Sequence, residues 1–341
     1  MAEKRPSYDH NRRALKDVIP LSTPYSSYVE ATRACNLKCF YCLHSTRDEK
    51  GGAMERLGLK IKHMDMDLYD KIVSELMQFP EQLKRITFSG MGEPLMNPRL
   101  GEMARKLRQA GYTGRNDVIS NGLLMTKERA AELVDAGITL FMFSVQGLTS
   151  ERYKEVCGVE VNMEEYIDNL RWLYEHKKDA QMYIKILDAN FKNRETEERQ
   201  FYEMFEDICD IINVEHLVLF SQEMESVYGN KLKDSQNFSG EAFVPRKVCA
   251  NMFYFMSPTV DGEVYPCSLP GLPITVSLGN VKKNTLQEIW NGEVRKNLIK
   301  TNLTSGFGAI PGCGYRCPCA NAVGSSAENL DDCASEILAR F

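Results

Sequence analysis

The stretch Cys35-Asn36-Leu37-Lys38-Cys39-Phe40-Tyr41-Cys42 organises the interpretation of the whole sequence. It places three thiols in a C-x3-C-x2-C spacing, directly after the strand-like run 27–32. Thiolates this close converge on one inorganic group, and an iron–sulfur cubane held by three cysteines keeps one iron open. The alternatives are a zinc knuckle or three unrelated cysteines. Zinc normally takes four ligands, usually in paired C-x2-C spacing, and no fourth cysteine lies nearby.

Composition and charge narrow the class of protein. The 341 residues are 43% hydrophobic and 26% charged, which suits one large globular domain with a smaller one, or two medium domains. A net charge of −5 disfavours a nucleic-acid partner held by phosphate contacts. No apolar run reaches bilayer length, and residues 1–17 lack the apolar core of a signal peptide. We therefore expect a cytoplasmic protein without a membrane partner, in which eleven cysteines serve as metal ligands and catalytic thiols rather than disulfides.

Strand-like and helix-like segments alternate six times between about residues 27 and 221. The expected strands are 27–32, 85–88, 117–120, 139–145, 182–187 and 216–220. The expected helices begin near residue 65 and then cover 98–109, 126–137, 153–176 and 195–212. This alternation predicts a parallel sheet with helices outside it. Six units are too few for a closed eight-fold barrel, so the predicted fold class is α/β, with an open or partial (β/α)6 barrel.

Polar residues follow several of these strands at the positions where parallel βα folds bind their ligands, the carboxyl ends. They are Gly92, Glu93, Ser120, Asn121, Ser144 and Gln146. Lys185 alternates with apolar neighbours on the fifth strand. Its side chain is expected either to point into the lumen, where it binds a carboxylate of a cofactor or substrate, or to lie at an ordinary strand edge.

The last 93 residues differ in character, because they hold six of the eleven cysteines. The dipeptide Asp261-Gly262 is a strong hairpin signal, so strands 253–260 and 263–265 are expected to pair. The expected domains are an N-terminal extension, a barrel, a polar linker and a Cys-rich C-terminal domain. Their predicted bounds are 1–26, 27–222, 223–248 and 249–341.

The cysteine stretch, with an aromatic residue before its third cysteine, resembles the radical S-adenosylmethionine (SAM) family. This resemblance implies that Cys35, Cys39 and Cys42 bind a [4Fe-4S] cluster whose open iron holds the methionine end of SAM. The segment 90–93 is similar to the family's Gly-Gly-Glu element, which binds the SAM amino group, although Met91 interrupts its glycines.

Three further sites follow from the same resemblance. The segments 120–122 and 144–147 resemble those that touch the SAM ribose and carboxylate, although many relatives carry Asp where Gln146 stands. Tyr41 is expected beside the adenine, and Leu219 is expected to flank it. For Tyr41 and Leu219 the alternative is plain packing in the core.

The C-terminal cysteines resemble the SPASM domain, an auxiliary-cluster module of radical SAM enzymes. The resemblance rests on the spacings C-x12-G and G-x4-C from residue 249 and on the runs 278–281 and 286–290. A full SPASM domain supplies seven cysteines for two clusters, whereas this segment has six and is closer to the shortened twitch form with one auxiliary [4Fe-4S] cluster. The implied ligands are Cys249, Cys267, Cys313 and Cys317, with Cys319 able to replace Cys317. A zinc site and a second auxiliary cluster are the alternatives.

The resemblance also implies a reaction. SAM is cleaved to a 5′-deoxyadenosyl radical, which removes a hydrogen atom from an unactivated carbon. The substrate radical then loses a proton and an electron, as in a dehydrogenase, or receives a hydrogen atom from a thiol, as in an epimerase. Peptide-oxidising relatives carry Asp directly after the cysteine equivalent to Cys267, whereas Ser268 stands here. This favours hydrogen return from Cys319 or Cys333, with Cys157 as a further candidate, or alcohol oxidation with another base.

The expected substrate is a sugar, polyol or aminocyclitol, since only about 34 residues precede Cys35 and a leader-peptide-binding domain needs more. A ribosomal peptide is the second candidate substrate. The expected protein partner is an electron donor such as flavodoxin or ferredoxin. A non-catalytic iron–sulfur electron carrier is the alternative from another class, and the open-iron motif argues against it.

Overall fold

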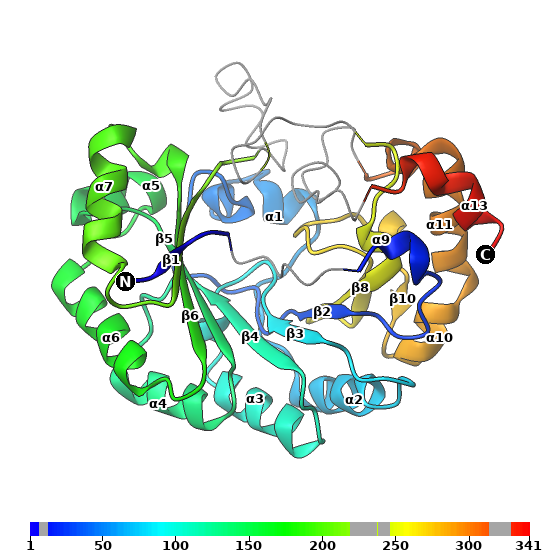
Figure 1. Ribbon diagram of the computed structural model, residues 1–341, viewed down its shortest axis with the longest axis horizontal. Helices are drawn as coiled ribbons and strands as arrows, with labels where there is room; N and C mark the ends of the chain where they lie inside the picture. Colours follow the sequence, from blue (N-terminus) through cyan, green and yellow to red (C-terminus); the bar gives the residue numbers. More distant parts are fainter. Residues whose placement is uncertain (7–12, 219–236, 238–245, 314–328) are drawn as a thin grey trace.

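The computed structural model describes residues 1–6, 13–218, 237, 246–313 and 329–341 (Figure 1). Leu219, Cys317 and Cys319 lie outside these ranges, so the roles given to them stay predictions. Within the described ranges, no helix is both long and apolar enough to cross a membrane.

Parallel strands form a curved sheet with helices along its convex side (Figure 1). In spatial order the barrel strands are β2 (Ser26–Val29), β3 (Arg85–Phe88), β4 (Arg115–Ser120), β5 (Leu140–Val145), β6 (Gln181–Leu187) and β7 (Ile211–Glu215). The outer helices include α2 (Met66–Leu76), α3 (Leu100–Gln109), α4 (Lys127–Asp135) and α6 (Met163–His176). Each neighbouring pair of these strands is parallel, which confirms the predicted α/β fold with an open barrel.

Capping side chains set where the outer helices begin. The Asp65 carboxylate accepts from the amide of Leu68 at the start of α2, and Thr126 caps α4, so both helices begin where the sequence predicted. The single helix expected over 153–176 is instead two, α5 (Ser150–Cys157) and α6. Gly158 separates them, because its left-handed backbone (φ 79°) ends α5.

The end of the barrel differs from the prediction. The last outer helix, α7 (Arg194–Phe205), stops well before residue 212, and the last barrel strand is β7 rather than 216–220. The apolar residues Ile211 and Ile212 fit a helical face as well as a strand, so the sequence pattern alone did not separate them. In the fold, Ile211 pairs with Tyr183 of β6.

The sheet continues beyond both edges of the barrel. At one edge β1 (Glu3–Lys4) pairs with β7, and at the other β8 (Phe255–Pro258) pairs in parallel with β2. β8 and β9 (Glu263–Tyr265) form the antiparallel hairpin predicted from Asp261-Gly262, and β9 pairs with β10 (Gly279–Asn280). The Cys-rich region is therefore joined to the barrel through one continuous sheet.

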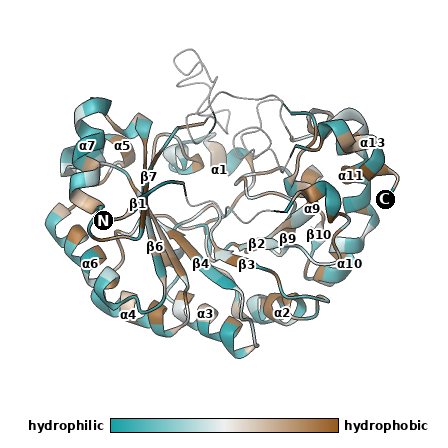
Figure 2. Ribbon diagram, viewed as in Figure 1, coloured by the Kyte–Doolittle hydropathy of each residue, from teal (hydrophilic) through white to brown (hydrophobic). Residues whose placement is uncertain are grey.

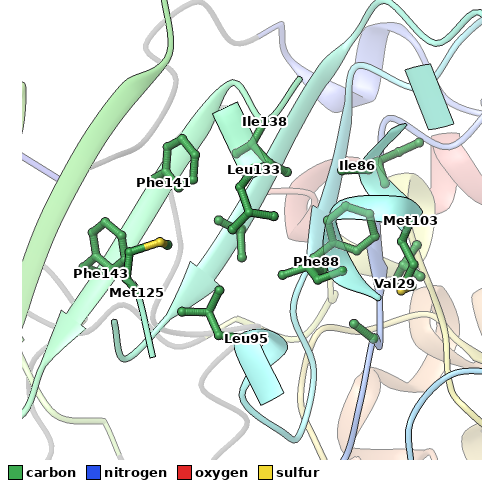
Figure 3. Close-up of a cluster of buried hydrophobic side chains, with 14 of the residues drawn as sticks. Val29, Ile86, Phe88, Leu95, Met103, Met125, Leu133, Ile138, Phe141 and Phe143 are labelled. Atoms are coloured by element: carbon green, nitrogen blue, oxygen red, sulfur yellow. The ribbon is translucent and has the colours of Figure 1, made fainter. Parts of the chain in front are cut away.

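The two faces of the sheet differ in polarity. The outer face packs against the helices through a large apolar cluster, which includes Phe88, Leu133 and Phe143 (Figure 3). Hydrophilic colours in Figure 2 follow the outward sides of the helices. The strand register places a mixed set on the concave face. Its polar members are Tyr28, Arg85, Thr87, Asp117, Tyr183, Lys185 and Glu215, and its apolar members include Leu140, Met142 and Ile211. Ligand chemistry therefore belongs to the concave side.

A second core supports the C-terminal region. It contains Phe253, of the short helix α9 (Asn251–Tyr254), and Ile299, of α11 (Glu293–Ser305). Other elements of this region are α10 (Leu286–Asn291) and α13 (Ala334–Leu338). Leu15 and Ile19 from the N-terminal segment pack into the same core, so the two ends of the chain meet there.

A buried ion pair joins the C-terminal hairpin to the barrel. Arg33 and Glu30 are each only 4% exposed, and Arg33 Nε donates to Glu30 Oε2 at 3.2 Å. Arg33 also pairs with Asp261 in the hairpin turn, and Glu30 accepts from the amide of Val260 at 3.0 Å. These contacts fix the hairpin turn beside the start of the cysteine loop.

Removing the Arg33 side chain tests this junction. Arg33→Ala leaves the Glu30 carboxylate buried without its cation, and such a change typically costs about 3–5 kcal/mol. We expect a fall of that order in the free energy of unfolding, measured by urea denaturation. The control is Lys178→Ala, which removes a pair with Asp135 whose side chains are 68% and 69% exposed, and it should cost less than about 1 kcal/mol. Equal losses in both variants would contradict the junction.

Candidate functional site

The cysteine loop follows β2 at the carboxyl ends of the barrel strands. Cys39 is buried, and Cys35 and Cys42 are half-buried. Burial raises the pKa of the Cys35 thiol to about 12, and the nearby Glu93 and Cys42 add to the rise. A cationic iron cluster reverses this effect, because thiols that burial keeps neutral become thiolate ligands beside a positive charge. The three neighbouring thiols therefore fit an iron–sulfur cluster.

Among the described residues, no three or more His, Cys, Asp or Glu side chains are grouped around a single metal-ion position. A cubane presents its irons at separate corners, so its ligands need not converge on one point.

Backbone contacts on both sides hold the cysteine loop in shape. The amides of Lys38 and Phe40 donate to the carbonyls of Cys157 and Val156 at 3.0 Å, at the end of α5. On the other side, Arg47 donates to the carbonyl of Leu37 at 3.0 Å. The Cys157 thiol is buried behind the loop, where it donates to the carbonyl of Tyr153 at 3.0 Å and is hydrogen-bonded to Cys39. The loop is therefore preformed by the chain itself.

Gly92 and Glu93 lie directly against this loop. The amide of Gly92 donates to the carbonyl of Thr32 at 3.2 Å, and that of Glu93 donates to the carbonyl of Ala34 at 2.8 Å. A Cβ on Gly92 would stand 2.4 Å from the Thr32 oxygen, so only glycine permits the approach.

The buried Glu93 carboxylate gathers residues from the next strand. It accepts from the Ser120 hydroxyl and from the Asn121 amide, both at 2.7 Å, and from the Leu95 amide at 3.0 Å. Burial raises the pKa of Glu93, and these hydrogen bonds oppose the rise. Asn121 reaches back to the loop, since its Nδ2 donates to Asn36 Oδ1 at 2.8 Å. The structure thus brings together three residues that the sequence predicted separately, and it adds Asn36.

A second group forms around Gln146. Its Oε1 accepts from the Tyr41 hydroxyl and from Asn190 Nδ2, the latter at 3.2 Å, while its Nε2 donates to the Ser144 carbonyl at 2.9 Å. Tyr41, Ser144 and Gln146 were predicted from the sequence. Asn190 was missed, and its only sequence signal is its place just after the fifth barrel strand.

The apolar side of Tyr41 is also occupied. Leu217 is buried among Phe40, Tyr41, Leu187 and Ala189. Leu217 therefore flanks Tyr41, whereas Leu219, which was predicted to flank the adenine, lies outside the described residues. Leu217 falls within the predicted strand 216–220, but no motif singled it out.

Lys185 lies on the concave face, as one of the two interpretations of its strand predicted. Its Nζ forms an ion pair with Glu215 Oε2 at 2.7 Å, and the Tyr183 hydroxyl donates to Glu215 Oε1 at 3.0 Å. Glu215 was missed because it fell between the predicted helix 195–212 and the predicted strand 216–220, whereas it ends β7. The role of Lys185 as a ligand for SAM or substrate stays a prediction.

The C-terminal cysteines occupy two places. Cys249 belongs to the second core, and Cys313 and Cys333 pack against the same cluster. The Cys333 thiol donates to the carbonyl of Leu330 at 3.6 Å. Cys267 follows β9, and its sulfur accepts from the amide of Leu269 at 3.4 Å. The auxiliary ligand set and the thiol donors stay predictions, since they also involve Cys317 and Cys319.

Comparison with known families agrees with this geometry. The model of the radical SAM superfamily matches residues 29–199, and that of the SPASM iron–sulfur cluster-binding domain matches residues 249–319. This chain belongs to the radical SAM superfamily. Its cofactors are a [4Fe-4S] cluster with SAM and auxiliary iron–sulfur chemistry in the SPASM domain. In this radical SAM protein, Cys35, Cys39 and Cys42 would hold the first cluster.

Curated relatives differ in activity. A tungsten-containing aldehyde ferredoxin oxidoreductase cofactor-modifying protein of Pyrococcus furiosus is 25% identical over 304 residues, covering 78% of this chain and 80% of the relative. The PqqA peptide cyclase of Rhodopseudomonas palustris is 30% identical over 153 residues, 45% of this chain and 37% of the cyclase. A probable GTP 3′,8-cyclase of Methanococcus vannielii is 34% identical over 136 residues, 38% of this chain and 39% of that enzyme.

Solved structures share the fold. BtrN in complex with AdoMet (SAM) and 2-DOIA superposes with a TM-score of 0.54 at 19% identity, covering 85% of this chain and 91% of BtrN. The enzyme anSMEcpe with bound AdoMet gives a TM-score of 0.56 at 18% identity, covering 93% of each chain. At such identities the likeness shows the fold alone.

The close approach at Gly92 gives a direct test of the SAM site. Gly92→Ala should push residues 92–93 away from the cysteine loop and weaken SAM binding at least about tenfold, a loss of about 1.4 kcal/mol. Equilibrium dialysis with labelled SAM on the anaerobic holoenzyme measures this, and iron content should stay unchanged. The matched control is Gly308→Ala, whose Cβ meets nothing within 4 Å. Unchanged SAM affinity in Gly92→Ala would place SAM elsewhere.

Proposed function

We propose that the protein dehydrogenates a small hydroxyl-bearing molecule, with a sugar, polyol or aminocyclitol as the substrate class. The bound cluster and SAM supply a radical that removes hydrogen from carbon. The observation that carries the proposal is the charged pair Lys185 and Glu215 on the concave face, near the carboxyl ends of the strands where Tyr41, Glu93 and Gln146 also gather.

Other polar side chains of the concave face are packed inside the sheet. Asp117 is fully buried and pairs with Arg85 at 2.6 Å and with Arg115 at 3.0 Å. The hydroxyl of Thr87, on the same face, is buried and makes no hydrogen bond. Both side chains are fully buried, so the polar groups of this face that a substrate can reach are those of Lys185 and Glu215, which keep some exposure. A small polar substrate suits these two charged groups better than an apolar one.

The positions of the two described candidate thiols favour oxidation over hydrogen return by either of them. Cys157 is buried behind the cysteine loop, and Cys333 packs against the second core. Neither belongs to a barrel strand, whose side chains form the concave face, and Cys319 lies outside the described residues. Carboxylate and amine groups, by contrast, are present there as Glu215 and Lys185. These groups support an alcohol oxidation in which a carboxylate acts as the base.

Epimerisation is the second candidate. The C-terminal region has six cysteines for four proposed ligand positions, so Cys319 or Cys333 is available as a hydrogen donor. In this alternative Cys319, which lies outside the described residues, returns the hydrogen atom.

The named neighbours bear on the substrate class. The BtrN structure contains 2-DOIA, whereas the anSMEcpe enzyme also has a structure with the Cp18Cys peptide. We favour a small molecule for this chain and keep a ribosomal peptide as the competing substrate. We also propose a cytoplasmic location and electron supply by a flavodoxin or ferredoxin, because the reaction needs a low-potential one-electron donor.

A single incubation separates these outcomes. The anaerobic, reconstituted protein is mixed with SAM, dithionite and either 2-DOIA, myo-inositol or D-glucosamine in D2O, and products are weighed by mass spectrometry. Dehydrogenation gives a product lighter by two hydrogens. An isomer carrying one solvent deuterium indicates epimerisation instead, and Cys319→Ala should then stop turnover. Conversion of none of these molecules by protein that still cleaves SAM would contradict the proposed substrate class.

A further inference from the structure

We propose that Glu215 is the catalytic base, which takes the proton from the substrate hydroxyl on the carbon that loses its hydrogen. This inference rests on the proposed dehydrogenation and names the residue that it requires. Ser268 occupies the place where peptide-oxidising relatives carry an aspartate, so a base must come from elsewhere in the fold.

The strand register places Glu215 on the concave face. In the pairing of β6 with β7, Tyr183 lies opposite Ile211, Lys185 opposite Asn213 and Leu187 opposite Glu215. Paired residues share a face, and side chains along a strand alternate, so Glu215 faces the same side as Tyr183 and Lys185. Glu215 is the last residue of β7, at the carboxyl end where the SAM-site residues also lie.

The carboxylate of Glu215 is fixed by two hydrogen bonds and can accept more. Its Oε1 accepts from the Tyr183 hydroxyl at 3.0 Å, and its Oε2 accepts from Lys185 Nζ at 2.7 Å. Each carboxylate oxygen can accept two hydrogen bonds, so one acceptor position remains on each oxygen. The residue is 9% exposed, so the carboxylate is largely withdrawn from bulk water yet not sealed. A substrate hydroxyl can fill the remaining position.

The distance to the SAM site suits a small substrate. Leu217, only two residues further on, packs against Tyr41, the residue predicted beside the adenine. Two residues of extended chain span at most about 7 Å. The backbone of Glu215 therefore lies within about 7 Å of the residue that packs against Tyr41, at the same end of the barrel. Lys185 beside it provides a compensating positive charge when the substrate is absent.

In the proposed alcohol oxidation, this carboxylate accepts the proton that the substrate loses. Loss of the C–H hydrogen leaves a carbon radical that still carries its hydroxyl group. The O–H bond then breaks, its proton passes to Glu215, and one electron leaves to an oxidised iron–sulfur cluster. A carbonyl forms, and the substrate has lost two hydrogens in total. Deprotonation by a positioned base typically contributes about 10²–10⁴ in rate.

The test uses Glu215→Gln in the reconstituted holoenzyme, with 2-DOIA and myo-inositol as probes. The amide keeps the shape and an acceptor oxygen but takes up no proton, so we expect SAM cleavage to continue while carbonyl product falls at least about 100-fold. Glu215→Asp keeps the acid on a shorter arm and should lose less. The control Glu203→Gln changes an exposed glutamate of α7 and should match wild type. Wild-type product formation by Glu215→Gln would overturn the assignment.

Binding of the two probes tests the role of Glu215 independently of turnover. If the wild-type protein converts neither probe, the proposed function is wrong for this substrate class. Calorimetric titration of the same two probes into the SAM-bound protein then decides the role of Glu215. Binding that weakens at least about tenfold in Glu215→Asp supports a hydroxyl-binding carboxylate. Equal affinity in the two proteins, or no binding to wild type, would overturn it.

Discussion

The site depends on one buried carboxylate, Glu93, which joins parts of the chain that lie far apart in sequence. Its backbone is hydrogen-bonded to Ala34 at the start of the cysteine loop, and its side chain accepts from Ser120 and Asn121 after the next strand. Buried charge is tolerated only where hydrogen bonds replace water, and three donors do so here. This arrangement fixes the loop, the Gly92 turn and the end of β4 relative to one another. The predicted SAM site is thus organised by contacts within the chain itself.

The same requirement, that buried polar groups have partners, accounts for how the two faces of the sheet differ. Helices cover the outer face, which is apolar, while the concave face carries the ion pairs of Asp117 and Glu215. The C-terminal hairpin extends this sheet past β2 and is anchored by Arg33 to Glu30 and Asp261. The SPASM region is therefore held beside the cysteine loop by sheet pairing and by buried charge together.

Local signals in the sequence were sufficient for much of the fold. Asp65 and Thr126 capped the expected helices, and Asp261-Gly262 formed the expected hairpin, because each depends on residues close in sequence. The last barrel strand was misplaced because Ile211 and Ile212 fit two periodicities, and Glu215 was missed with it. Contacts such as Tyr41 with Gln146, 105 residues apart, are set by tertiary packing and leave no local signal. The motifs therefore predicted which residues form the candidate site, whereas their hydrogen-bond partners became known only from the structure.

The central claim is that Cys35, Cys39 and Cys42 hold a cluster separate from that of the C-terminal cysteines. The most direct measurement is Mössbauer spectroscopy with iron and sulfide analysis on anaerobically reconstituted wild-type protein and on a variant with all three residues replaced by alanine. The account predicts that the variant loses about four irons per chain and keeps the auxiliary iron. Unchanged iron content, or loss of all iron in a folded variant, would contradict it.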